Sequence, residues 1–96
     1  MKGQVVVVRT RNAGVHVGAT DQLVTGDGVL TLTDARRVWR WRGANTLHEL
    51  AMHGASMTEW TRISEPVPTI SVVGVIEVIP CSPEGAANLA QSRWLN

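Results

Sequence analysis

Residues 4–10 read QVVVVRT, and this run of four valines is the strongest strand signal in the chain. An unbroken β-branched series is typical of a strand that is covered on both faces, because a strand with one wet face would alternate apolar and polar residues. RNAG at 11–14 indicates a tight turn, and VHVGA at 15–19 then alternates as a second strand. The opening of the chain therefore predicts two antiparallel strands joined by a short turn.

Further strands are expected downstream of this pair. TGDG at 25–28 is a turn signal, and VLTLT at 29–33 alternates with the period of a strand. Asp34 interrupts the pattern and is expected to mark a bulge or a short break, after which Arg36–Arg42 resumes as strand. TISVVGVIEVI at 69–79 is the longest apolar run, and it predicts a central strand.

Two short segments carry helix-boundary signals. NTLHELAMHG at 45–54 combines Thr46 with Glu49 as a capping box, and Gly54 occupies the position where helices often end in a left-handed residue. SPEGAANLAQ at 82–91 begins with serine as an N-cap and proline at the first helical position. The whole pattern predicts an α+β fold: a mainly antiparallel β-sheet of about five strands, open or barrel-like, with two short helices.

The composition limits the architecture and the classes of partner. A chain of 96 residues supports one compact core, so we expect a single domain over residues 1–96. The formal net charge is only +1, which provides no general attraction to extended nucleic acid or to anionic membranes. Cys81 is the only cysteine, so no internal disulfide is expected, and no apolar run approaches a signal-peptide core or a membrane span. We therefore expect a cytoplasmic protein.

Residues 35–44 read ARRVWRWRGA and contain four of the eight arginines and two of the four tryptophans. Strict alternation in a strand places Ala35, Arg37, Trp39 and Trp41 on one face and Arg36, Val38, Arg40 and Arg42 on the other. One interpretation is structural: the indoles pack in the core while the arginine stems cover the solvent side of the sheet. The other is functional, because the arginines repel one another unless a negative group lies nearby, and the nearest acids in sequence are Asp34 and Glu49.

The functional interpretation predicts a site for a small anionic nucleotide. Arginine binds phosphate bidentately, and tryptophan provides a plane on which a base can stack. The candidate ligand-binding residues are Arg36, Arg40 and Arg42 for phosphate, Trp39 or Trp41 for the base, and Arg9 and Arg11 if the first strand converges on the same patch. Strict alternation places the tryptophans opposite the three phosphate-binding arginines, so one ligand contacts both only at a sheet edge, a bulge or a subunit interface.

Signals for catalysis and metal binding are weak. HELAMH at 48–53 resembles a zinc-protease motif, but His48 and His53 are five residues apart, which places them about 140° apart around a helix. Cys81 precedes a helix start, a position that can activate a thiol, yet no base partner is evident. An enzyme would need a cleft that joins Glu77, a histidine and Cys81. We therefore expect no catalytic residues, no metal site and no cofactor.

Glu77 lies inside an apolar run and has two possible environments. On the apolar face of its strand it would need a partner, and an arginine of residues 35–44 is the obvious one. On the other face it would simply be exposed to solvent.

Four stretches give the chain a resemblance to a known family: VVVRTRNAGVHVG at 6–18, LTDARRVWRWRGANTLHELAMHGA at 32–55, RISEPVPTI at 62–70 and IEVIPCSPEGAANL at 76–89. The chain resembles a family of small uncharacterised proteins, carried mainly by phages and prophages, that is described as a domain of unknown function. The resemblance carries over no functional residue. It implies a phage-type context, in which small proteins often bind and block a host component, and in which one class sequesters nucleotide immune signals without chemistry.

We therefore expect a non-enzymatic, phage-type binding protein that sequesters a small anionic nucleotide in the host-cell cytoplasm. The alternative is a protein-interaction module, in which residues 35–44 bind and inhibit a host protein through an acidic surface, with tryptophans as anchors. Four tryptophans in so small a protein, with Trp60 and Trp94 outside this stretch, also suggest a homo-oligomer.

Overall fold

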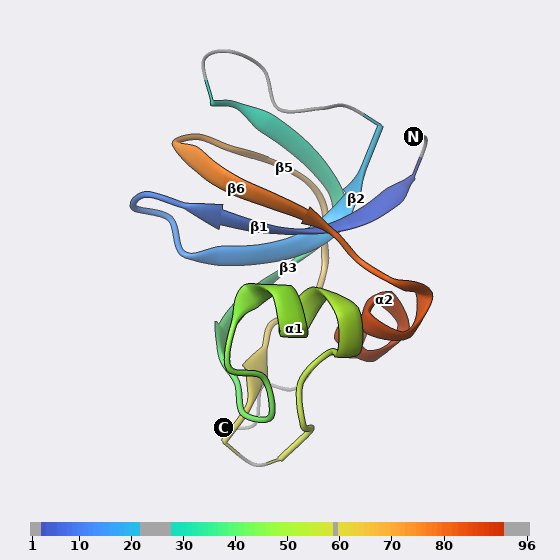
Figure 1. The fold of residues 1–96 in the computed structure, drawn as a ribbon. Helices are drawn as coiled ribbons and strands as arrows, with labels where there is room; N and C mark the ends of the chain where they lie inside the picture. The colour runs from blue at the N-terminus through green and yellow to red at the C-terminus, as the bar shows by residue number, and fades with distance from the viewer. Residues whose placement is uncertain (1–2, 22–27, 59, 92–96) are drawn as a thin grey trace.

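The computed structural model describes residues 3–21, 28–58 and 60–91, and this part of the chain forms six strands and two helices (Figure 1). In chain order these are β1 (Gln4–Thr10), β2 (Val15–Thr20), β3 (Leu30–Arg40), α1 (Leu47–His53), β4 (Arg62–Ile63), β5 (Val67–Val72), β6 (Val75–Pro80) and α2 (Pro83–Leu89). All strand pairs are antiparallel, which confirms the predicted α+β class with a mainly antiparallel sheet and two short helices.

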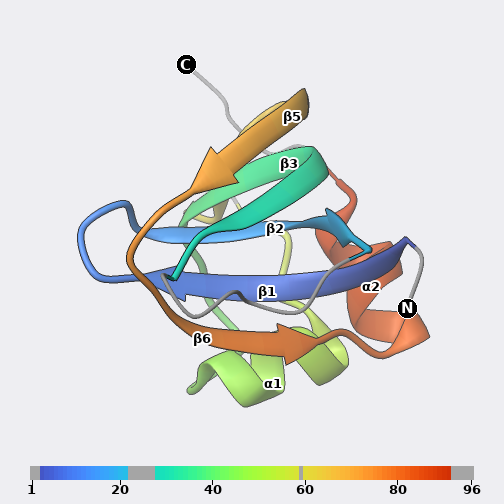
Figure 2. The same ribbon diagram turned by 90° about the horizontal axis from the view of Figure 1, so that it is seen from above.

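The strands lie in the order β4-β3-β2-β1-β6, and β5 pairs with the first half of β3 on the same edge as β4. Figure 2 shows β5, β3, β2, β1 and β6 side by side in that order. β5 and β6 follow one another in sequence but pair with different strands, β3 and β1. The sheet is therefore open between β5 and β6, and the barrel-like alternative is wrong.

β1 lies between β2 and β6, and apolar side chains cover it on both faces. Val7 belongs to the cluster on the helix side of the sheet, together with Leu50 of α1 and Leu89 of α2. Val6 and Val8 belong to a second cluster on the opposite face, which we call the inner cluster; its buried members are Val6, Val8, Leu30, Leu32, Ala35 and Val72. The valine run thus contributes to both cores, as predicted for a strand covered on both faces.

Asp34 forms a bulge in β3. Its φ is +48°, and the register between β2 and β3 shifts between Val17 and Ala19. Because of the extra residue, Leu32 and Ala35 both belong to the inner cluster although an odd number of positions separates them. The expected bulge or break is therefore a bulge within one continuous strand.

The apolar run at 69–79 is not one central strand, so that prediction is wrong. Gly74, with φ of +70°, lies in the connection between β5 and β6 and allows the chain to reverse there. β5 and β6 each have a single neighbouring strand and form edges of the sheet. Hydrophobicity alone did not reveal the reversal, because both halves of the run are apolar.

The capping signals located both helices correctly. The Thr46 hydroxyl accepts a hydrogen bond of 3.2 Å from the Glu49 backbone N–H, and Gly54 follows α1 with φ of +78°. The Glu49 carboxylate accepts a 2.7 Å hydrogen bond from the Asn45 backbone N–H, one residue earlier than in the usual capping box. Ser82 caps α2 by accepting a 3.0 Å hydrogen bond from a backbone N–H of its first turn.

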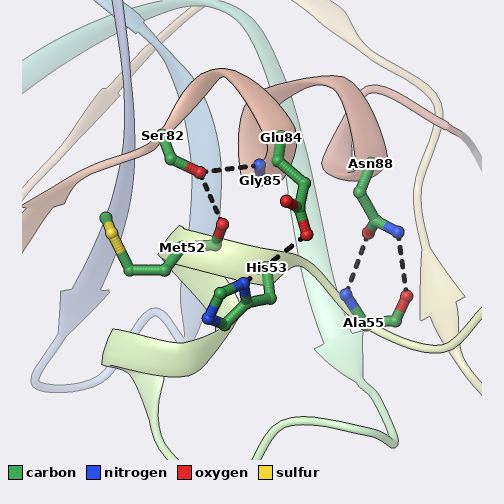
Figure 3. Close-up of polar contacts among 7 residues, drawn as sticks. All are labelled: Met52, His53, Ala55, Ser82, Glu84, Gly85 and Asn88. Carbon is green, nitrogen blue, oxygen red and sulfur yellow. Dashed lines mark hydrogen bonds and ion pairs between the residues drawn. The ribbon is translucent and has the colours of Figure 1, made fainter.

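α1 and α2 are joined by contacts to the backbone of α1 and of the residues that follow it (Figure 3). The Ser82 hydroxyl donates to the Met52 carbonyl oxygen. The Asn88 side chain bonds the Ala55 backbone twice, accepting from its N–H at 2.9 Å and donating to its carbonyl oxygen at 3.0 Å. These bonds satisfy backbone groups at the end of α1 and fix the two helices in register.

The helices also approach one another closely. A Cβ on Gly85 would overlap the Ala51 carbonyl oxygen, so this packing requires glycine. At the exposed rim of the contact, the Nδ1 atom of His53 lies 3.5 Å from a carboxylate oxygen of Glu84. Neither helix in the described ranges is long and apolar enough to cross a membrane.

Candidate functional site

Residues 35–40 form the second half of β3, at the edge where β4 pairs with it, and residues 41–44 continue beyond the strand. The β3–β4 register shifts between Val38 and Arg40, which introduces a second irregularity into β3. Val38 and Trp41 both pack in the helix-side cluster, and the Trp41 indole N–H donates to a backbone carbonyl oxygen at 3.2 Å. Trp39, by contrast, is 54% exposed. The prediction that Trp39 and Trp41 share a face is therefore wrong, because the extra residue shifts the alternation.

The Arg40 side chain lies against two tryptophans. Its guanidinium carbon is 4.7 Å from the centroid of the Trp39 ring and 4.8 Å from that of Trp60, a residue between α1 and β4. Its Nε donates a 2.7 Å hydrogen bond to the Trp60 carbonyl oxygen. The two cation–π contacts and the hydrogen bond together hold Arg40 in one orientation at the edge of the sheet.

Arg42 contacts the same indole, with its guanidinium carbon 4.5 Å from the centroid of the Trp60 ring. Its backbone is fixed by Thr61, whose hydroxyl accepts from the Arg42 N–H at 3.3 Å, and by Ser56, whose N–H donates to the Arg42 carbonyl oxygen at 2.8 Å. We call Trp39, Arg40, Arg42 and Trp60 the Arg/Trp cluster. The shifted alternation thus brings two predicted arginines and one predicted tryptophan to one surface.

The remaining predicted arginines lie elsewhere on the sheet. Arg36 donates from Nη1 to the Ser64 carbonyl oxygen at 3.4 Å, beside the connection between β4 and β5. Arg9 forms an ion pair of 2.9 Å with Glu77 of β6, and Arg11 lies in the turn after β1. The partner of Glu77 is therefore an arginine of β1, and β2 separates β1 from β3.

Trp60 is the one member of the cluster that lies outside residues 35–44. It is 40% exposed, and its ring contacts both Arg40 and Arg42. It lies 20 positions from Arg40, so no local periodicity connects the two residues. The signal that the sequence offered for Trp60 was its residue type, tryptophan. Trp94, the other tryptophan outside the stretch, lies beyond the described residues.

A pocket of about 540 Å³ opens between β2, β3 and the start of β5, and sequence reasoning did not identify it. Its walls include His16, Arg36, Arg37, Glu65, Val67 and Ile70. His16 is buried, and its Nε2 lies 2.8 Å from the Ala13 carbonyl oxygen. Burial lowers the pKa of His16 below its ordinary value of 6.5; the Ala13 contact opposes this shift, and the Arg37 charge adds to it. His16 is therefore neutral at pH 7.

Glu77 and Cys81, two of the groups that the enzyme interpretation combines, have different surroundings. Glu77 lies within β6 and pairs with Arg9 on β1, whereas Cys81 is buried just after the last residue of β6. Burial raises the pKa of the Cys81 thiol to about 11, so it stays protonated at neutral pH, and the helix start that follows does not activate it. His48 and His53 are exposed on α1. Within the described ranges, no three His, Cys, Asp or Glu side chains are grouped so as to hold a metal ion.

Residues 3–89 match the family model described as Domain of unknown function (DUF6948). The match spans all the strands and helices described above, and the description names no ligand, activity or origin. No curated protein and no solved structure is significantly similar to the chain.

Proposed function

We propose that this chain, which belongs to the family described as a domain of unknown function (DUF6948), binds a small anionic nucleotide without transforming it. The proposed site is the Arg/Trp cluster at the end of β3. The observation that carries the proposal is the position of Arg40, which Trp60 fixes against the exposed Trp39 ring. A guanidinium can bind the phosphate of a nucleotide, and an indole can stack on its base.

Arg40 and Arg42 supply the phosphate-binding groups. The Nε of Arg40 donates to the Trp60 carbonyl oxygen, and the two Nη groups of Arg40 can donate to phosphate oxygens. Arg42 contacts the same indole, and we propose that both guanidiniums bind the phosphate of one ligand. Because stacking and hydrogen bonding already hold Arg40, phosphate binding costs little additional side-chain entropy.

Trp39 supplies the stacking surface for the base. Its ring is 54% exposed, and stacking of a base on an aromatic side chain contributes about 1–3 kcal/mol. A net charge of +1 provides weak long-range attraction for a polyanion, so a single nucleotide suits the chain better than extended nucleic acid.

The resemblance to phage-borne proteins extends the proposal to a biological role. In that setting the nucleotide would be a signal of host immunity, and the protein would sequester it in the host cytoplasm as a sponge. This extension depends on where the gene comes from, whereas the binding proposal depends only on the Arg/Trp cluster.

A protein-interaction surface is the second candidate. Trp39 and Trp60 are 54% and 40% exposed, and exposed tryptophans beside arginines are characteristic of interface hot spots. Under this alternative the Arg/Trp cluster would bind an acidic surface of a host protein. Arg40→Ala would then abolish capture of that protein without changing the response to nucleotides.

A thermal-shift panel of mono-, di- and cyclic nucleotides, at low and moderate salt, tests the proposal. A ligand at about a thousand times its Kd should stabilise the fold by about 4 kcal/mol. We expect one nucleotide class to raise the Tm of the wild type, and Arg42→Gln to remove most of that rise at the same concentration. Arg9→Gln is the matched control, because it removes an equal charge from the arginine that pairs with Glu77. This control should respond as the wild type does.

Two results would contradict the proposal: no stabilisation by any nucleotide, or equal stabilisation of wild type and Arg42→Gln. The second candidate would then be tested by comparing wild type with Arg40→Ala as baits for a protein partner. Binding of an acidic protein to wild type alone would support it.

A further inference from the structure

The pocket between β2, β3 and the start of β5 has the size of a small-molecule site. Its volume of about 540 Å³ lies in the range of roughly 300–1,000 Å³ that ligand pockets occupy. Its lining contains none of the four residues of the Arg/Trp cluster. The pocket is therefore a different surface from the proposed nucleotide site.

One wall of the pocket is apolar. Ala35 and Ile70 belong to the inner cluster, so this wall continues into the core of the sheet. Val67, the register partner of Ala35 on β5, is 44% exposed. Ala35 itself is buried, so the apolar surface that a ligand would cover comes from Val67 and the half-buried Ile70. Covering it favours binding by about 25 cal/mol for each Å² buried.

Arg37 also lines the pocket, and its backbone is fixed. The Arg37 N–H donates to the Ser64 hydroxyl at 2.8 Å, and the Ser64 N–H donates to the Arg37 carbonyl oxygen at 3.0 Å. The side chain passes over Gly14 in the turn between β1 and β2. Among the residues that the structure describes, its guanidinium makes no hydrogen bond or ion pair. It is therefore available to an anionic ligand.

The charges that line the pocket suit one negative charge better than two. Among the described residues that line it, Arg36 and Arg37 carry positive charges and Glu65 carries a negative charge, a sum of +1. His16 adds none, because it is buried as the neutral imidazole. A phosphate dianion would overcompensate this charge and meet the Glu65 carboxylate, whereas a monoanion is balanced by it.

We infer that this pocket binds a small amphipathic carboxylate, with its apolar body against Val67 and Ile70, beside the buried Ala35, and its carboxylate on the Arg37 guanidinium. Charge-assisted hydrogen bonds between guanidinium and carboxylate set the orientation. The apolar wall selects a hydrocarbon or aromatic body in place of a sugar. This site is independent of the nucleotide site, and the two can fail separately.

Naphthoate and its neutral analogue naphthamide are suitable probes, because they share one apolar body and differ in charge. We expect calorimetry to detect naphthoate binding, with naphthamide binding at least about tenfold more weakly, the loss expected for one charge-assisted hydrogen bond. Arg37→Gln should weaken naphthoate binding by a similar factor. Arg42→Gln, which removes an equal charge from the Arg/Trp cluster, should leave it unchanged. Val67→Glu should weaken it as well, by placing a second carboxylate on the rim.

Proton–nitrogen correlation spectra of the same samples locate the probe and confirm that each variant is folded. We expect naphthoate to shift the backbone signals of Ala35, Val67 and Ile70. The inference would be overturned by equal affinity for naphthoate and naphthamide, by unchanged affinity of Arg37→Gln, or by shifts confined to Trp39 and Trp60. Absence of naphthoate binding to the wild type would also overturn it, and would leave the nucleotide proposal unaffected.

Discussion

Arg40 is bound to Trp60 in two ways: its Nε donates a 2.7 Å hydrogen bond to the Trp60 carbonyl oxygen, and its guanidinium carbon lies 4.8 Å from the centroid of the indole ring. Arg40 ends β3, and Trp60 precedes β4, so the contact fastens the segment between them to the edge of the sheet. The Arg/Trp cluster is therefore a structural element as well as the proposed binding surface, and its two roles can be measured separately.

Arg40→Ala should lower the free energy of unfolding by about 2 kcal/mol. The substitution removes two cation–π contacts, each worth about 0.5–1 kcal/mol, and one hydrogen bond of similar size. Urea denaturation measures the change. Arg11→Ala, at an exposed turn position, is the control and should alter stability by less than about 0.5 kcal/mol. Equal stability of the two variants would show that the contact with Trp60 does not stabilise the fold.

Much of the fold was predictable because its signals are local. The valine run of β1, the Asp34 bulge and the caps at Thr46 and Ser82 each depend on residues within a few positions. Pairing partners were not predictable in the same way. The run at 69–79 divides at Gly74, and its halves pair with β3 and β1, so its role was decided by contacts distant in sequence.

Gly85→Ala should destabilise the protein by about 3 kcal/mol or more, which is the upper range for overpacking. Its new methyl group would meet the Ala51 carbonyl oxygen, a backbone atom that cannot move without displacing α1. Ala87→Ser is the matched control, because it adds one atom on the exposed face of the same helix. Chemical denaturation of the two variants compares them. A small loss for Gly85→Ala would mean that α1 and α2 are packed less closely than described.

The candidate site was less predictable than the fold. Period-two alternation placed Trp41 beside Trp39, but the register shift between Val38 and Arg40 turned Trp41 into the helix-side cluster. Trp60 joined the cluster from a separate segment of the chain. An irregularity of one residue decides which side chains share a face, and its position depends on the partner strand β4.

Stability should fall as the pH is lowered through about 6.5, because of His16. Burial lowers the pKa of folded His16 below 6.5, with Arg37 acting in the same direction, so the unfolded chain binds the proton more tightly. The loss begins near the unfolded pKa and is complete once the pH is below the folded pKa. Unfolding free energies measured across this range test the effect. His16→Gln should have a smaller pH dependence; an identical dependence would exclude His16 as its source.

The indole N–H signals of the tryptophans, followed by proton–nitrogen correlation spectra during titration with adenosine monophosphate and its cyclic form, test the proposed function most directly. We expect the Trp39 and Trp60 signals to shift in parallel with saturation. The Trp41 signal should remain in place, because its indole N–H is bonded to the Ala44 carbonyl oxygen at 3.2 Å and its ring packs on the helix-side cluster. Conservative Trp→Phe variants assign the signals. Unchanged Trp39 and Trp60 signals at saturating nucleotide, or a shift of Trp41 alone, would contradict a nucleotide site on the Arg/Trp cluster.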